Sequence, residues 1–298
     1  LNKKQRFIGA AFGGMMLFLA FPFTGSITPL IFIGFVPLLS IEASINQSKS
    51  SSWTILLYSL ICFLIFNIGT SWWLINASLG GAIFAFLFNS VIMTICFQAF
   101  HLTRKYVGSK EGYLALPFYW LGLEYLHNHW EFAHPWLTLG NTFSIRTSWI
   151  QWYEYTGVSG GSLWVITVNV LCYLAYRSWK KKQNFRGAII TVSIAILLPI
   201  AVSIFVGFQH RNQIKQEKNK QKLEHSFGKT AQQFHSVRNQ TVAEAMTKFQ
   251  LKTHINLLVM INNKHSFFDN LFFKNTVNQI GFHLNIPFLV IPSKTYKS

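Results

Sequence analysis

The chain has 298 residues, of which 51% are hydrophobic, 16% are aromatic and only 12% are charged. Soluble domains carry about 25% charged residues, so this composition excludes a disordered chain and, with only three cysteines, a disulfide scaffold, and it indicates a membrane protein. The formal net charge of +17 would suit a nucleic-acid-binding protein, but the basic residues form no single patch with a recognition motif, and no nucleic-acid partner is expected.

Seven apolar runs are candidates for membrane-crossing helices, because a bilayer core of about 30 Å needs ~20 apolar residues in a helix. The first run follows Lys3, Lys4 and Arg6, and no small-residue cleavage site precedes a soluble domain. It is therefore interpreted as a retained helix and not as a signal peptide. The predicted spans are 7–23, 29–43, 53–75, 79–101, 113–127, 161–177 and 187–208.

The distribution of Lys and Arg between the predicted loops orients the bundle. With a cytoplasmic N-terminus, the inner loops carry twelve basic residues, whereas the outer loops before residue 209 carry Arg146 alone. Cytoplasmic loops of membrane proteins are enriched in Lys and Arg. The N-terminus is therefore expected inside and, after seven spans, the C-terminal region outside.

The outer loop after the fifth span is rich in aromatic and histidine side chains, from His127 to Tyr153. Its composition fits an aromatic belt at the lipid–water interface and equally a re-entrant segment that lines a lipid-facing pocket. Within it, His127, Glu131 and His134 have the spacing of one helical face and offer zinc ligands. Pro135 interrupts that pattern, so no metal site is expected.

Glu124 is the most informative charged residue of the apolar half, since it lies inside or at the end of the fifth predicted span. A carboxylate at membrane depth is costly and is by default a candidate for a functional site. The alternative is a Glu at the interface that hydrogen-bonds to neighbouring Trp or His side chains.

Half of the 26 Lys and Arg residues follow Phe208. This shift places a domain boundary there, with a transmembrane helical domain at 1–208 and a separate region at 209–298. In that region, 209–225 is polar and is interpreted as a solvated helix or linker. The rest predicts an amphipathic helix and then a parallel βαβ unit: helix 228–249, strand 255–261, helix 268–282 and strand 286–291.

A series of short motifs carries a family resemblance, because their order and spacing hold over residues 7–208. In that range the chain resembles the membrane domain of apolipoprotein N-acyltransferase. The motifs are Ala20–Phe23, Gly69–Leu74, Leu116–Glu124, Pro135–Asn141, Trp149–Leu163 and Asn169.

The resemblance implies a multi-pass enzyme of the bacterial inner membrane that needs no cofactor. It would transfer an acyl chain from a phospholipid to the N-terminal diacylglyceryl-cysteine of lipoproteins, through a Glu–Lys–Cys triad. The implied fold is a polytopic α-helical membrane protein with about seven transmembrane helices, followed by a partial α/β nitrilase-like (αββα) domain on the outer side. The expected substrate-binding residues are Glu124, Pro135, Trp136, Trp72 and Trp73.

The C-terminal region departs from the family's pattern. Its first predicted strand is followed by Asn262, where the family has its catalytic Glu, and an amide does not accept a thiol proton as a carboxylate does. No Cys follows Cys172, and Lys294 and Lys297 come too early to be the family's Lys. The triad is therefore not intact, and the chain as written is predicted to have no N-acyl transfer activity.

Several interpretations of this departure stay open. The chain is a truncated product, a fragment of a longer chain, or a degenerate relative. The competing function is a non-catalytic relative that binds lipid or lipoprotein through its membrane domain. A transporter is the weakest alternative, because no internal repeat is found.

Overall fold

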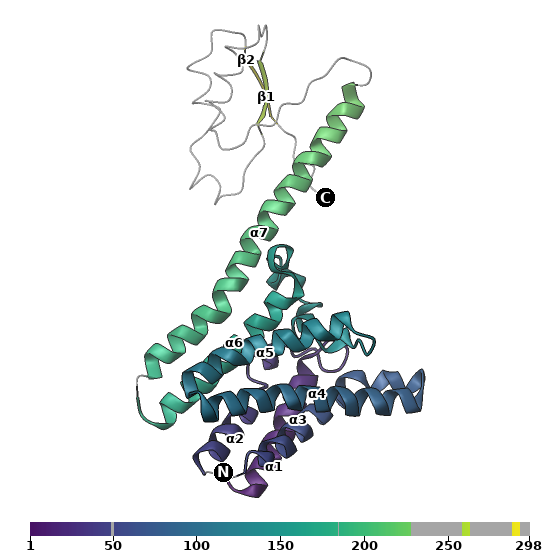
Figure 1. The fold of residues 1–298 in the computed structure, drawn as a ribbon. Helices are drawn as coiled ribbons and strands as arrows, with labels where there is room; N and C mark the ends of the chain where they lie inside the picture. The colour runs from purple at the N-terminus through teal and green to yellow at the C-terminus, as the bar shows by residue number, and fades with distance from the viewer. Residues whose placement is uncertain (49–50, 184, 228–257, 263–287, 293–298) are drawn as a thin grey trace. The chain divides into compact units, whose positions relative to one another are not determined.

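The computed structural model describes residues 1–48, 51–183, 185–227, 258–262 and 288–292. The chain divides into two compact units, Leu1–Lys220 and Gln221–Ser298. In the described part of the first unit, every secondary-structure element is a helix, and turns and irregular segments connect the helices (Figure 1). Its α-helices are α1 (Lys3–Ala20), α2 (Val36–Gln47), α3 (Trp53–Ser71), α4 (Leu79–Tyr106), α5 (Ser109–His129), α6 (Tyr153–Lys180) and α7, which starts in this unit and spans Phe185–Phe227.

Five helical stretches are long and apolar enough to cross a membrane: Thr28–Gln47, Trp53–Asn76, Leu79–Tyr106, Tyr153–Lys180 and Phe185–Asn212. They confirm five of the seven predicted spans. The other two are also helical, as α1 and α5. Both helices carry charged residues, which in α1 are three basic residues at its start. That these two helices cross the membrane stays a prediction.

The second predicted span is not one continuous helix. A 3-10 helix, η1 (Thr28–Phe32), precedes α2, and the chain between them is irregular. Asn169 of α6 pairs with the backbone on both sides of this break. Its side chain donates to the Ile31 carbonyl at 2.7 Å and accepts from the Phe35 amide at 2.9 Å. A break inside a membrane bundle is tolerated where such partners replace the lost helix bonds.

The helices pack around a core of large aromatic rings. Phe35, Phe63 and Trp120 are fully buried and meet edge to face or tilted, with the Phe35–Trp120 ring centroids 5.0 Å apart. Close helix approach needs small residues, and α1 meets α3 at Gly14, where an added Cβ would overlap the Cys62 carbonyl. Helix α4 packs along both α3 and α5 (Figure 1).

The described part of the second unit contains two strands, β1 (Leu258–Asn262) and β2 (Phe288–Pro292), which pair in parallel. This confirms the predicted pair of parallel strands. Asn262 is the last residue of β1 and is in register with Pro292. The predicted helices 228–249 and 268–282 lie outside the described residues. Residues 209–225 are helical, because α7 continues to Phe227.

Candidate functional site

Glu124 lies on the buried face of α5 and not on its exposed face. Trp120, Leu123, Glu124 and His127 follow one another at the spacing of a single helical face, and all four side chains are buried, with 6% of Glu124 exposed. The neighbouring Tyr125 on the opposite face is 66% exposed. The carboxylate predicted at membrane depth is therefore enclosed by the protein.

One oxygen of this carboxylate accepts two hydrogen bonds. Glu124 Oε1 accepts hydrogen bonds from the Trp120 indole at 3.1 Å and from the Leu139 amide at 2.9 Å. Leu139 begins η4 (Leu139–Phe143), a 3-10 helix in the segment between α5 and α6. The Ser162 hydroxyl of α6 also interacts with the carboxylate. Glu124 thus ties this segment to the helical bundle.

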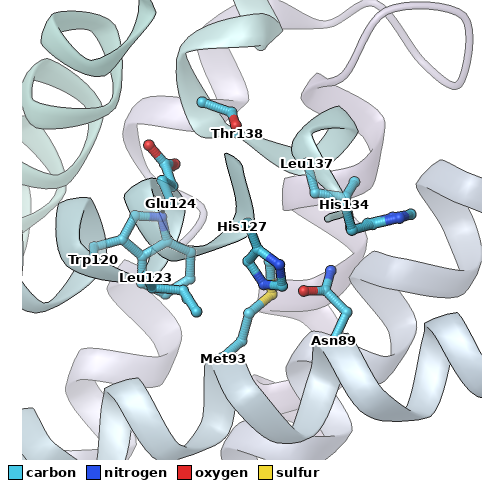
Figure 2. Close-up of a pocket in the computed structure, with 9 residues that line it drawn as sticks. All are labelled: Asn89, Met93, Trp120, Leu123, Glu124, His127, His134, Leu137 and Thr138. Atoms are coloured by element: carbon cyan, nitrogen blue, oxygen red, sulfur yellow. Dashed lines mark hydrogen bonds between the residues drawn. The ribbon is translucent and has the colours of Figure 1, made fainter. Parts of the chain in front are cut away.

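A small cavity of about 10 Å³ lies beside Glu124 (Figure 2). This volume is roughly that needed by one water molecule, so the cavity cannot hold an acyl chain. Three elements enclose it: α4, α5 and the segment that follows α5. The lining residues are Asn89, Met93, Trp120, Leu123, Glu124, His127, His134, Leu137 and Thr138.

Several polar atoms around this cavity are buried and make no hydrogen bond with the described residues: Glu124 Oε2, both ring nitrogens of His127, and Asn89 Oδ1. The His127 ring does interact with the Phe132 carbonyl, without hydrogen-bond geometry. Asn89 is also anchored from its other side, since its amide donates to Asn67 Oδ1 at 2.6 Å. Unpaired buried polar atoms are rare in native proteins and need an explanation.

His134 reaches the same cavity from the segment after α5. Burial, followed by the effect of the nearby His127 charge, lowers the pKa of His134 to about 4. Its imidazole is therefore neutral at pH 7 and adds no positive charge beside Glu124.

The predicted helical face of His127, Glu131 and His134 is wrong, because α5 ends at His129. His127 and His134 nevertheless line one cavity, whereas Glu131 does not. Among the described residues, no group of three or more His, Cys, Asp or Glu side chains is placed to hold a metal ion.

The predicted tryptophans are exposed at the surface and do not line this cavity. Pro135 begins η3 (Pro135–Leu137), a 3-10 helix four residues before Leu139. Trp136 is 61% exposed and contacts Trp73 edge to face, with ring centroids 6.0 Å apart. Trp72 is also exposed beside Trp73, in η2 (Trp72–Asn76). The structure therefore joins the Trp72–Trp73 and Pro135–Trp136 motifs through one ring contact.

A second cluster of four rings joins the first part of α4 to the segment after α5. Phe84 and Phe88 stack 5.2 Å apart, and both contact Phe132; Trp130 contacts Phe88 and Phe132. Trp130 also meets the buried His127 ring edge to face at 5.4 Å. The surface rings and the buried polar cavity are thus directly connected.

A second buried polar cluster was not predicted from the sequence. Glu42 of α2 is fully buried, forms an ion pair with Arg104 and shares a hydrogen bond with His101 Nδ1 at 2.8 Å, both partners coming from α4. The Arg104 guanidinium lies 4.4 Å from the centre of the Tyr113 ring. Arg104 was expected to be a loop charge, and that expectation is wrong, because α4 continues to Tyr106 and buries it. The sequence did contain one signal for this cluster, because Glu42 is a charged residue inside an apolar run.

A larger open groove, of about 420 Å³, lies between the 147–151 turn and α7. The Ser203 hydroxyl of α7 links the two sides of the groove. It donates to the Ser148 carbonyl at 2.8 Å and accepts from the Gln151 amide at 2.6 Å. Apolar Ile204 and cationic Arg211 both line it. Unlike the cavity at Glu124, this groove has room for part of an amphipathic molecule.

Comparisons with known proteins identify the family of the chain. Residues 13–171 match the family described as the apolipoprotein N-acyltransferase N-terminal domain. The chain is 30% identical over 193 residues to the apolipoprotein N-acyltransferase of Chlorobaculum tepidum. That match covers 63% of this chain but only 35% of the relative, so the chain spans about a third of the relative's length. No solved structure matches the chain.

Proposed function

The chain belongs to the apolipoprotein N-acyltransferase family, and we propose that residues 1–208 serve as its membrane domain. In this proposal the domain lies in the bacterial inner membrane with its N-terminus inside. It presents a phospholipid, the acyl donor, to a region on the outer side that also receives a lipoprotein acceptor. The matched residues 13–171 contain the Glu124 cavity and the joined tryptophan motifs, which supports this assignment.

The observation that carries the proposal is the link from Glu124 through Leu139 to Trp136. Glu124 holds the Leu139 amide, and the preceding turn places Trp136 against Trp73. Trp and Tyr rings are favoured where one end of a side chain meets lipid and the other meets water. We therefore assign lipid contact to Trp72, Trp73, Pro135 and Trp136. Glu124, enclosed beside a cavity of one water, is the positioning residue of this substrate-binding set.

The groove beside α7 supports the same function. Arg211 at its rim lies at the end of the stretch Phe185–Asn212 that is able to cross a membrane. A cation at that depth suits a phospholipid phosphate, while Ile204, which lies inside the stretch, suits the start of an acyl chain. In the proposal this groove holds a lipid headgroup.

For the 298-residue chain itself we propose lipid and lipoprotein binding without acyl transfer. Asn262 stands at the end of β1, where the resemblance implies the general base. The lone pair of an amide nitrogen is delocalised into the carbonyl, so an amide does not take up a thiol proton as a carboxylate does. The three cysteines, Cys62, Cys96 and Cys172, all lie in helices of the first unit, and the first two are buried. The amide at Asn262 therefore supports, as our proposal for this chain, a lipid-binding member of the family whose own general base is missing.

The test uses the purified chain in lipid nanodiscs that contain a phospholipid with a photoreactive acyl chain. Trp136→Ala and Trp73→Ala are each expected to reduce crosslinking to the chain several-fold. Trp53→Ala is the matched control, because Trp53 is 77% exposed at the start of α3, away from these motifs. If the two test variants crosslink to the lipid as strongly as the Trp53→Ala control does, the lipid-binding proposal is wrong.

Activity is measured separately, with a diacylated lipopeptide as acceptor. The chain is expected to leave the lipopeptide amine free. Formation of a triacylated product by the purified chain would contradict the proposed absence of transfer, while leaving the lipid-binding assignment to the crosslinking result.

A further inference from the structure

Four exposed cations gather where α6 is joined to α7, and we call them the α6–α7 cation cluster. Lys180 is the last residue of α6, Lys181 and Lys182 follow it, and Arg186 lies in the first turn of α7. Both helices belong to stretches that are long and apolar enough to cross a membrane. The short connection between them therefore lies at a membrane surface, whichever side the N-terminus occupies.

The charges of the cation cluster have no carboxylate near them in the sequence. No Asp or Glu lies between Glu154 and Glu217. The ion pairs found among the described residues lie elsewhere, at Glu42 and Glu154. Lys180 lies over the Tyr176 ring, 5.0 Å from its centre, and this contact supplies no full negative charge. Like charges so close together repel one another, so an anion at this surface is favourable.

Lys182 has a backbone conformation that favours glycine. Its φ is 51°, in the left-handed region. The end of α6 forms the two hydrogen bonds of a Schellman motif, since the Lys182 amide donates to the Trp179 carbonyl and the Gln183 amide to the Ser178 carbonyl, both at 3.0 Å. The left-handed position of this motif is usually Gly, because a side chain there is strained. The fold alone therefore favours Gly at 182, and the lysine is explained if its charge is used.

Arg186 is also poorly placed for the stability of its own helix. The N-terminus of a helix carries a partial positive charge, which disfavours a cation in the first turn of α7. Aromatic rings lie beside the cluster, because Trp179 is 58% exposed and contacts Tyr176, with ring centroids 6.2 Å apart. Trp and Tyr are typical of the lipid–water interface. The surroundings of the cluster therefore suit a lipid surface better than a free anion in water.

We propose that the α6–α7 cation cluster binds the headgroups of anionic phospholipids in the adjacent leaflet. Clusters of four to eight Lys and Arg beside a membrane helix recognise such headgroups, and each cation near an anionic surface strengthens binding about fivefold. Arg211, in the groove described above, lies at the other end of the stretch Phe185–Asn212. The cluster is therefore a separate site, and the inference does not rest on the proposed function.

Lys182→Gly separates lipid binding from folding. Gly adopts the left-handed conformation without strain, so the midpoint of thermal unfolding is expected to rise when no anionic lipid is present. The same variant loses one cation, so its affinity for phosphatidylglycerol is expected to fall about fivefold, and about 25-fold when Arg186→Gln is added. Lys110→Gln is the matched control, because Lys110 is an exposed cation at the start of α5 that is followed by Glu111.

Binding is measured by native mass spectrometry of the full chain in detergent, which counts bound lipids as phosphatidylglycerol is added. Phosphatidylcholine is the control for a headgroup without net charge, and inorganic phosphate is the control for a free anion. The parent chain and Lys110→Gln are expected to bind phosphatidylglycerol more tightly than phosphatidylcholine, and Lys182→Gly is expected to lose most of this difference.

Three results would each overturn the proposal. The first is an affinity of Lys182→Gly for phosphatidylglycerol equal to that of the parent chain. The second is displacement of phosphatidylglycerol by an equal concentration of inorganic phosphate, which would mean that the cluster takes a free anion. The third is a lower unfolding midpoint for Lys182→Gly without anionic lipid, which would mean that the lysine serves the fold.

Discussion

The Leu139 amide donates a 2.9 Å hydrogen bond to Oε1 of Glu124, so a carboxylate in α5 holds the beginning of a 3-10 helix 15 residues later in the chain. The same oxygen accepts from the Trp120 indole, one turn earlier in α5. Through these two hydrogen bonds, Glu124 fixes the position of the segment that carries Trp136 relative to α5.

Glu124→Leu is expected to destabilise the fold more than Glu124→Gln. Leu leaves the Leu139 amide and the Trp120 indole unpaired, at a cost of about 1–3 kcal/mol for each buried donor. Gln keeps an oxygen that both donors reach. The measurement is the thermal unfolding midpoint of the two variants in the same detergent. Equal midpoints would show that the two hydrogen bonds do not hold the segment.

Glu42→Leu is expected to be among the most destabilising single substitutions in the bundle. It leaves the buried Arg104 and His101 without their carboxylate, and breaking a buried ion pair by removing one partner costs about 3–5 kcal/mol. Chemical unfolding of the variant and the parent chain measures the difference.

Glu154→Gln is the matched control, since the Glu154–His210 pair is half exposed. Removing an exposed pair changes stability by about 0–1 kcal/mol. A loss at Glu154 as large as the loss at Glu42 would show that burial does not set the strength of these pairs.

The stability of the fold is expected to fall as the pH is lowered from about 6.5 towards 4, in part because of His134. Its pKa is about 4 in the folded chain, against an unshifted value of 6.5. Between these two values the unfolded state binds the proton and the folded state does not, so acid favours unfolding.

His134→Asn, which cannot be protonated in this range, is expected to reduce the dependence of the unfolding midpoint on pH. The control is His129→Asn, in which an exposed imidazole is removed. If His129→Asn flattens the pH profile as much as His134→Asn does, the burial of His134 is not responsible.

Labelling with a membrane-impermeant maleimide tests the proposed orientation. A cysteine introduced at Ser298 is expected to react from the outer side of intact cells. A cysteine introduced at Lys181, just after α6, is expected to react only after the cells are opened, because that loop carries the basic residues typical of the cytoplasmic side. The reverse labelling pattern would invert the topology.

Properties that depend on local sequence were determined by the sequence alone. Apolar runs of ~20 residues identify membrane helices because the bilayer imposes that length, and five stretches bear this out. The apolar segments that became β1 and β2 pair in parallel as predicted. Glu124 was recognised as a candidate because a charge inside an apolar run is costly in any fold.

The partners of these residues were decided only by the tertiary structure. Leu139 reaches Glu124 because α5 ends at His129 and the chain then turns back, whereas helical spacing had placed His127, Glu131 and His134 on one face of a continuing helix. The pairing of Glu42 with Arg104 joins residues 62 positions apart. Periodicity reports which face of a helix is buried, but it carries no information on which other helix covers that face. That choice is made by the packing of side chains from distant segments.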